Sequence, residues 1–162
     1  MIGRSNFHKV FPISIFVVLT LGIGGLSNPI TWTVYTNWYV DLNKPFFTLP
    51  IWIFASVCSL LYVMMGIAAA RVWMFGRHHL WGITALYHYA VQLLFNGLWS
   101  LVFFGLKEPK LALLVIVVLF ILIERSIHWF KIVDRTAGYL LYPYLAWIVY
   151  AGLLNGIIAL NN

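Results

Sequence analysis

The sequence predicts an all-α integral membrane protein, a bundle of five transmembrane helices. Two observations carry this prediction. Apolar residues make up 63% of the 162-residue chain and charged residues only 9%, whereas a soluble domain has about 25% charged residues to cover its surface. The few charges also divide the chain into apolar stretches near the roughly 20 residues that a helix needs to cross a hydrocarbon core. This composition excludes a soluble enzyme and a disordered chain.

The expected spans follow from these stretches in order. Four of them hold between 18 and 27 residues without Asp, Glu, Lys or Arg. The other, Leu111–Ile123, is shorter, but apolar residues continue it to Phe130, and basic side chains near a helix end can reach the membrane surface. Long apolar runs favour helices over a barrel, because a backbone in lipid must satisfy its own hydrogen bonds. We predict one domain over residues 1–162, with spans at about 10–27, 50–73, 80–106, 109–131 and 137–160.

Five spans place the two termini on opposite sides of the membrane. The side with the N-terminus carries seven basic residues and the other side three. Because basic loops tend to stay in the cytoplasm, we expect a cytoplasmic N-terminus. The first 27 residues also fit a secretory signal peptide, with Arg4 and Lys9 before an apolar stretch, but this stretch is long for one, so a membrane span is favoured.

The longest loop, 28–49, has about 22 residues and is rich in aromatic side chains and proline. A loop of that length is usually functional or disordered. Its aromatic content predicts that it packs on the membrane face of the bundle as a lid.

Two spans carry stripes of polar and aromatic residues at helical spacing. The stripe of the third span is Tyr89, Gln92, Asn96, Trp99 and Phe103. The stripe of the last span is Tyr144, Trp147, Ala151, Asn155 and Ile158. Because amides are costly in lipid, both stripes are expected to face the bundle interior. The amides then either hydrogen-bond between helices or take part in a binding site.

Depth in the membrane favours a binding site. At 1.5 Å per residue, several of these positions and Cys58 share a layer roughly 8–15 Å below the face that carries loop 28–49. Aromatic walls, a few amides and a lid predict a pocket for a flat, largely apolar ligand. The alternative for the tryptophans is an interfacial aromatic belt, which explains Trp99 and Trp147 less well because they lie deeper.

The sequence shows no catalytic or metal-binding constellation. No charged residue lies at a span centre, and no nucleophile shares a layer with a base. The single cysteine, Cys58, excludes a disulfide framework and a cysteine-rich zinc site. A haem subunit needs paired histidines, but the depths of His88 and His128 differ by roughly 8–10 Å. We therefore expect no cofactor, and the absence of a Lys/Arg run argues against nucleic-acid binding.

Three segments, in order along the chain, carry longer motifs. The first reads Trp38-Tyr39-x-x-Leu42-x-Lys44-Pro45, followed by Pro50-x-Trp52-x-Phe54 and Leu61-Tyr62. The second reads Tyr89-x-x-Gln92-Leu93-x-x-Asn96-x-x-Trp99-Ser100-x-x-Phe103-Phe104, and the third reads Pro143-Tyr144-Leu145-Ala146-Trp147, followed by Leu154-Asn155 and Leu160-Asn161. Together they resemble the TspO/MBR family over about residues 22–161. This family comprises the tryptophan-rich sensory proteins of bacteria and the mitochondrial translocator protein, or peripheral benzodiazepine receptor.

The resemblance implies a five-helix bundle, often a homodimer, in this case in a bacterial membrane. It implies binding of porphyrins such as protoporphyrin IX, of isoquinoline or benzodiazepine-type ligands and, in some members, of sterols. By matching position, the pocket residues are Asn96, Trp99, Phe103, Trp147, Ala151 and Leu154, with Trp38 and Pro45 in the lid; depth adds Cys58. The implied role is a receptor that regulates tetrapyrrole handling or a stress response. The alternatives are a porphyrin-degrading photoenzyme, a tetrapyrrole or sterol transporter, and a plain helix-packing subunit.

The chain departs from the family pattern in three places. Leu49-Pro50 stands where the family has Pro-Pro. Cys58 stands where the family usually has a tryptophan. That tryptophan and the one that matches Trp147 are linked in bacterial members to light-dependent porphyrin breakdown, so the cysteine weakens the case for that activity here. No basic residue follows Arg135, so the sterol motif of animal members is incomplete. Lys44 is the nearby cation for the carboxylates of a porphyrin.

Overall fold

The computed structural model describes residues 3–26 and 38–161, which are helical apart from short connections and contain no strand. The elements are α1 (Gly3–Leu26), the 3-10 helix η1 (Tyr39–Asp41), α3 (Ile51–Gly76), α4 (Leu80–Ser100), the π-helix η2 (Leu101–Gly105), α5 (Pro109–Val133), α6 (Arg135–Tyr139) and α7 (Tyr142–Asn161). Five of these helices are long, namely α1, α3, α4, α5 and α7. The predicted all-α five-helix fold is confirmed.

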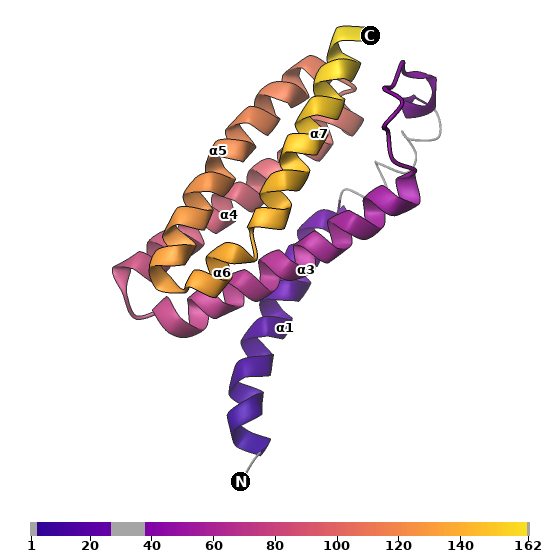
Figure 1. The fold of residues 1–162 in the computed structure, drawn as a ribbon. Helices are drawn as coiled ribbons and strands as arrows, with labels where there is room; N and C mark the ends of the chain where they lie inside the picture. The colour runs from indigo at the N-terminus through magenta and orange to yellow at the C-terminus, as the bar shows by residue number, and fades with distance from the viewer. Residues whose placement is uncertain (1–2, 27–37, 162) are drawn as a thin grey trace.

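The long helices of the bundle are not all parallel to one another. α4, α5 and α7 run side by side, and α3 crosses them at an angle (Figure 1). α3 contacts α4 and α6 at one end of the bundle, and it diverges from α7 toward the end where residues 38–50 lie (Figure 1). α1 packs against α3 and projects from the other helices. The divergence of α3 from α7 positions the site described below.

Among the described residues, three helical segments are long and apolar enough to cross a membrane. They are Trp52–Gly76, Pro109–Val133 and Arg135–Asn161, with 25, 25 and 27 residues. The apolar part of α1, Val10–Gly25, is a shorter helix of the same character. Asp134 separates the second segment from the third: its side chain accepts hydrogen bonds from the backbone N–H groups of Thr136 and Ala137 and so caps α6. The third segment itself breaks between Tyr139 and Tyr142, and Pro143 lies in the first turn of α7, where proline is tolerated.

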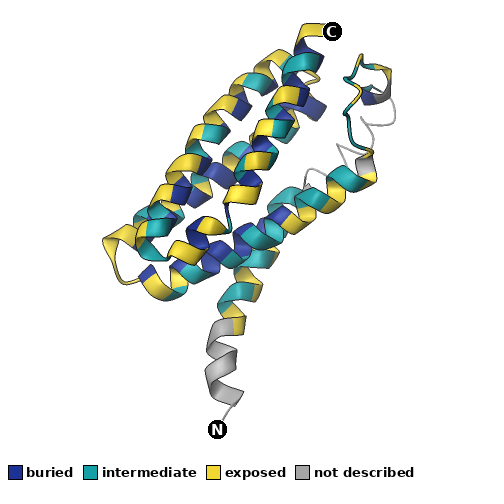
Figure 2. Ribbon diagram, viewed as in Figure 1, coloured by how far each residue is buried: buried dark blue, intermediate teal, exposed yellow. Residues whose placement is uncertain are grey.

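Buried residues lie on the sides of the helices that face one another, and exposed residues, many of them apolar, lie on the outer sides (Figure 2). The largest cluster of buried residues joins α3, α4, α5 and α7 and includes Met65, Leu119, Ile123 and Phe130. The outward apolar surface is what a lipid-exposed bundle requires, because lipid is as apolar as a protein core.

Small residues and hydroxyls attach α1 to the bundle. A Cβ atom added to Gly66 of α3 would lie 2.6 Å from the Cα atom of Val17, so glycine allows the two backbones to touch. The buried hydroxyls of Thr20 and Tyr89 lie 2.5 Å apart. Because Thr20 donates to the carbonyl of Phe16, Tyr89 is the donor to Thr20. This bond connects α1 to α4 in the bundle interior.

An ion pair closes the end of the bundle away from residues 38–50. Nε of Arg71 in α3 lies 2.5 Å from Oδ2 of Asp134, at the corner between α5 and α6. Partial burial works against the charge of the Asp134 carboxylate, but the hydrogen bond and charge of Arg71 outweigh it, with help from two backbone N–H groups. The pKa of Asp134 is therefore lowered. α3 is held here and is free to diverge at its other end.

Candidate ligand-binding site

Two adjoining cavities lie between the described parts of α3, α4 and α7. Cavity 1 is lined by Phe54, Cys58, Leu61, Tyr62, Asn96, Trp99, Ile116, Tyr144, Trp147, Ile148 and Ala151. Cavity 2 is lined by Tyr39, Leu49, Phe54, Trp99, Phe103, Phe104, Ala151, Leu154 and Asn155. Phe54, Trp99 and Ala151 belong to both linings. The two cavities thus form one continuous region.

Only a small part of the empty space in this region is enclosed by the protein. The empty space between the lining atoms, mouths included, is about 390 Å³ in cavity 1 and about 440 Å³ in cavity 2. The part that a water-sized sphere can occupy is about 30 Å³ in each. Ligand pockets commonly measure roughly 300–1,000 Å³, so the 30 Å³ inside either cavity is too small for such a ligand. A flat ligand therefore needs the walls to move apart, and α3 and α7 are suited to this because they contact each other little.

One amide organises the inner wall of cavity 1. Tyr62 of α3 donates a hydrogen bond to Oδ1 of Asn96 over 3.0 Å. Nδ2 of Asn96 donates in turn to the hydroxyl of Tyr144 in α7. Asn96 is 7% exposed and Tyr144 3%. The polar atoms of Asn96 are thus used between helices, and what the wall offers to a ligand is mainly aromatic surface.

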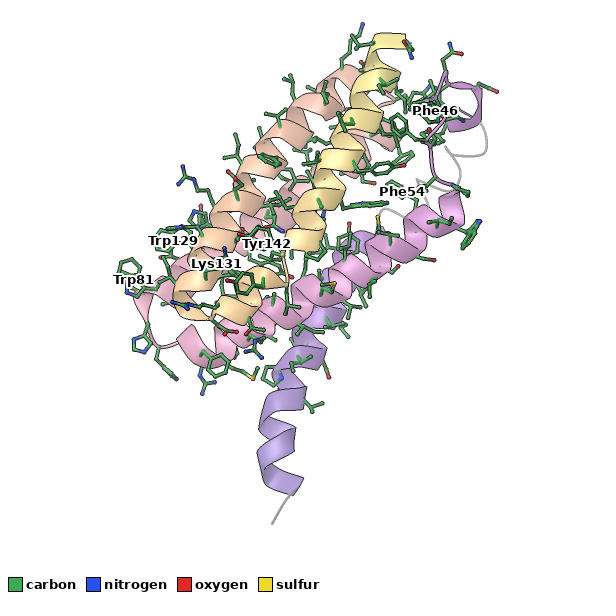
Figure 3. All side chains as sticks on the ribbon, in the orientation of Figure 1. Phe46, Phe54, Trp81, Trp129, Lys131 and Tyr142 are labelled. Atoms are coloured by element: carbon green, nitrogen blue, oxygen red, sulfur yellow. The ribbon has the colours of Figure 1, made fainter. Side chains whose placement is uncertain are left out.

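Trp147 forms the outer wall of cavity 1. Its ring lies 5.0 Å from that of Phe54 in α3 and 5.1 Å from that of Tyr150, one turn further along α7. Figure 3 shows Phe54 projecting from α3 toward α7. Cys58 lies one turn after Phe54 and lines the same cavity. Trp147 and Phe54 are therefore the aromatic contact that a ligand entering between α3 and α7 has to part.

Trp99 and two phenylalanines form the wall of cavity 2. The ring of Trp99 stacks on Phe103 with centroids 5.6 Å apart and meets Phe104 edge-on at 6.1 Å. Both phenylalanines belong to η2, where Leu106 N–H bonds to the carbonyl of Leu101. The wider π-turn buries Val102, Phe103 and Phe104 in succession. Such π-turns occur frequently at functional sites.

Residues 38–50 cover the mouth of cavity 2. Trp38 and Tyr39 contact the ring of Phe103 at 5.8 and 6.1 Å. The hydroxyl of Tyr150 donates to the carbonyl of Phe47 over 3.1 Å and accepts from the backbone N–H of Leu49 at 3.3 Å. This hydroxyl fastens the segment to α7 just before α3 begins.

The expected lid, 28–49, is described only from residue 38 onward; residues 28–37 lie outside the described part of the chain. Within it, Pro45 lines neither cavity, and its carbonyl accepts hydrogen bonds from the backbone N–H and hydroxyl of Thr48. Lys44 donates to the carbonyl of Tyr39 over 2.8 Å, and its ammonium lies 4.8 Å from the centre of that ring.

The cavities bring together seven of the nine residues expected at the site, which are Cys58, Asn96, Trp99, Phe103, Trp147, Ala151 and Leu154. Trp38 lines neither cavity and acts through its contact with Phe103. Sequence reasoning placed neither Phe54 nor Tyr62 in the site. Phe54, Cys58 and Tyr62 are four residues apart, so they share one helix face. That spacing was the available signal.

The histidines considered as haem ligands lie away from the cavities. The rings of His88 and His128 are 5.9 and 5.6 Å from the ring of Trp129. Trp129 stacks on Trp81 at the end of the bundle opposite Phe46 (Figure 3). Within the described residues, no group of three or more His, Cys, Asp or Glu side chains is placed to hold a metal ion.

Comparison with known proteins places this architecture in a family. The model of the TspO/MBR family matches residues 15–160. The chain is 40% identical to the tryptophan-rich sensory protein of Cereibacter sphaeroides over 74% of its length and 73% of the relative's. It is 37% identical to the tryptophan-rich protein TspO of Archaeoglobus fulgidus over 92% and 94%, and 34% identical to the translocator protein of Bos taurus over 74% and 71%. This membrane protein belongs to the TspO/MBR family.

Proposed function

We propose that the protein is a membrane receptor for flat, largely apolar ligands of the tetrapyrrole class, with protoporphyrin IX as the test ligand. The observation that carries the proposal is the continuous aromatic-lined region between α3, α4 and α7. Trp99 and Trp147 offer indole faces for stacking. Ala151 belongs to both linings and has no side chain beyond Cβ, which leaves room for a ligand to extend from one cavity into the other.

The name of one relative, a tryptophan-rich sensory protein, supports a sensing role. The name of another, a translocator protein, agrees instead with the transporter alternative. A receptor passes on a signal through a change in its conformation. Because α3 diverges from α7, the angle between these two helices can change when a ligand binds. A ligand that parts Trp147 from Phe54 would widen the angle between these helices, so binding and helix position would be coupled.

Lys44 is the proposed partner of the ligand carboxylates. It lies in the segment that covers cavity 2, and it would have to exchange its contact with the Tyr39 carbonyl for a carboxylate. We also propose that the opposite end of the bundle, which carries Arg71, Arg77, Arg125 and Lys131, faces the cytoplasm.

The test is a titration of the purified protein in nanodiscs with protoporphyrin IX, followed by tryptophan fluorescence and by the Soret band. Trp147→Ala removes a stacking face, and Ala151→Leu fills the junction of the cavities. We expect each to weaken affinity by about tenfold or more, since the loss of a stacking face and the overpacking of a narrow junction each cost about 1.4 kcal/mol or more. Trp129→Ala, which removes an indole at the other end of the bundle, is the matched control and keeps wild-type affinity. Equal affinities in all four proteins would overturn the proposal.

A further inference from the structure

Two residues that line cavity 2 each hold a buried polar atom with no hydrogen-bond partner among the described residues. The two atoms are Nε1 of Trp99 in α4, which can only donate, and Oδ1 of Asn155 in α7, which can only accept. Asn155 is 1% exposed. Buried polar groups are nearly always paired in native proteins, because leaving one unpaired costs its full desolvation. Each atom therefore calls for a specific explanation.

The orientation of both side chains is fixed by their neighbours. Nδ2 of Asn155 donates to the carbonyl of Pro109 over 2.9 Å. A flipped amide would set two acceptors against each other, so Oδ1 is the free atom. The indole of Trp99 is held between its stacking contact with Phe103 and its edge contact with Phe104. Two residues of the same cavity lining thus hold one unpaired donor and one unpaired acceptor, each in a fixed side chain.

The other lining residues define which polar groups the cavity accepts. They are aromatic or aliphatic, and among the residues that the structure describes no Asp, Glu, Lys, Arg or His lines cavity 2. An ionised group would lose its hydration there without a counter-charge. A neutral group that accepts from the indole and donates to the amide would pair both atoms and fit the uncharged wall.

We propose that cavity 2 recognises the neutral polar end of an aromatic ligand, a hydroxyl or a secondary amide, which accepts a hydrogen bond from Nε1 of Trp99 and donates one to Oδ1 of Asn155. This inference rests on the proposed function, since it assigns chemistry to one part of the same binding region. It predicts discrimination by hydrogen bonding: a ligand without the polar group leaves two protein atoms unpaired, which a site of this kind penalises strongly.

The test uses flat ring systems of similar size that differ in polar groups. Fluorene has neither a donor nor an acceptor, fluorenone only accepts, carbazole only donates, fluorenol does both with one atom, and phenanthridinone does both with two atoms. Partition of each compound between protein-loaded and empty nanodiscs gives an affinity corrected for solubility in lipid. We expect fluorenol or phenanthridinone to bind wild type about tenfold tighter than fluorene. If fluorenol binds tighter, one ligand atom bonds to both Nε1 of Trp99 and Oδ1 of Asn155. If phenanthridinone binds tighter, two ligand atoms do so.

Two variants assign the atoms. Trp99→Phe is expected to lower the affinity for fluorenone and leave that for carbazole unchanged, whereas Asn155→Leu does the reverse. Gln92→Leu is the matched control, because Gln92 is a fully buried amide of α4 that lines neither cavity, and it leaves the series unchanged. If Asn155→Leu does not fold, the affinities of the five compounds for wild type and for Trp99→Phe still test the proposal.

The inference fails alone if protoporphyrin IX binds with the expected Trp147 dependence while all the compounds bind wild type equally. It fails together with the proposed function if neither protoporphyrin IX nor any compound binds above the empty discs. Preference for fluorenol or phenanthridinone that survives in Trp99→Phe and in Asn155→Leu would also overturn it, because the preference would then arise elsewhere.

Discussion

Tyr62 of α3 donates its hydroxyl hydrogen to Oδ1 of Asn96 of α4, with 3.0 Å between the two atoms. Nδ2 of Asn96 donates a second hydrogen bond to the hydroxyl of Tyr144 of α7. One side chain therefore joins α3, α4 and α7, three of the four helices whose described residues line cavity 1. Because α3 and α7 otherwise contact each other little, this amide sets how far the helices can part.

Asn96→Leu removes both bonds and leaves the hydroxyls of Tyr62 and Tyr144 without this partner inside the bundle. We expect a loss of about 1–3 kcal/mol in the free energy of unfolding, since bonds between helices in membranes contribute about 0.6–1.7 kcal/mol each. Steric trapping or titration with dodecyl sulfate in micelles measures it. Tyr62→Phe, which removes one bond only, is expected to cost about half as much. If Asn96→Leu proves no worse than Tyr62→Phe, the three-helix connection is not structural.

Gly24 of α1 allows Tyr62 to take its position. A Cβ atom added at Gly24 would lie 2.2 Å from the Tyr62 ring, whereas one added at Gly25 meets nothing within 4 Å. Gly24→Ala is therefore expected to displace Tyr62 from Asn96, with a cost of about 1–3 kcal/mol from overpacking. Gly25→Ala is the matched control and is neutral or slightly stabilising, because alanine favours helix. The same unfolding titration, with protoporphyrin affinity as a second readout, compares them. Equal stability of the two variants would refute this role of Gly24.

The helices and their inward faces could be predicted because lipid imposes strong constraints on sequence. Apolar runs of about 20 residues fix the number of spans, and the spacing of Asn96, Trp99 and Phe103 fixes the face of the third span. Both follow from local periodicity. The same reasoning places Trp147 and Ala151 on the inward face of the last span.

What local periodicity cannot predict depends on contacts between distant segments. The position of Tyr62 beside Asn96 results from the crossing angle of α3, which Gly24 and Gly66 in close contact with neighbouring helices help to set. The π-turn at 101–105 has no residue pattern that distinguishes it from an α-helix, so the sequence predicts that the third span simply continues through it. The break between α5 and α6 lies at Asp134, whose side chain caps the start of α6 and can do so only where the chain already turns.

Tyr150→Phe tests how the covering segment is fastened. It removes the hydroxyl that binds the Phe47 carbonyl and the Leu49 N–H, and it keeps the ring that packs on Trp147. We expect an intact fold, hydrogen exchange about fivefold faster at residues 47–49, as loss of about 1 kcal/mol of local bonding implies, and faster ligand release. Exchange detected by mass spectrometry and stopped-flow release of protoporphyrin measure these. Tyr139→Phe, at the other end of the bundle, leaves both rates unchanged. Exchange that does not change in Tyr150→Phe would show that the hydroxyl is not the fastening.

The ion pair between Arg71 and Asp134 predicts how stability depends on pH. The Asp134 carboxyl has its pKa lowered in the folded protein, while the unfolded chain has the ordinary value of about 3.9. The pair therefore contributes fully above the unfolded value and loses its contribution as the pH falls through the folded value. The side chains of Arg71 and Asp134 are 32% and 14% exposed, so solvent screens the pair, and we expect the charged bond to contribute about 0.5–1 kcal/mol.

Asp134→Asn is expected to be less stable than wild type at pH 6 by that amount. The difference should shrink as the pH is lowered below about 4, because the unfolded wild-type chain binds a proton at Asp134 there before the folded protein does. Unfolding in a non-ionic detergent, followed by circular dichroism between pH 3 and 7, measures the difference. Glu124→Gln, which neutralises an exposed carboxylate of α5, serves as the control with no change at pH 6. A difference between wild type and Asp134→Asn that stays constant down to pH 3 would mean that the backbone cap at α6, and not the charge of Arg71, is what Asp134 contributes.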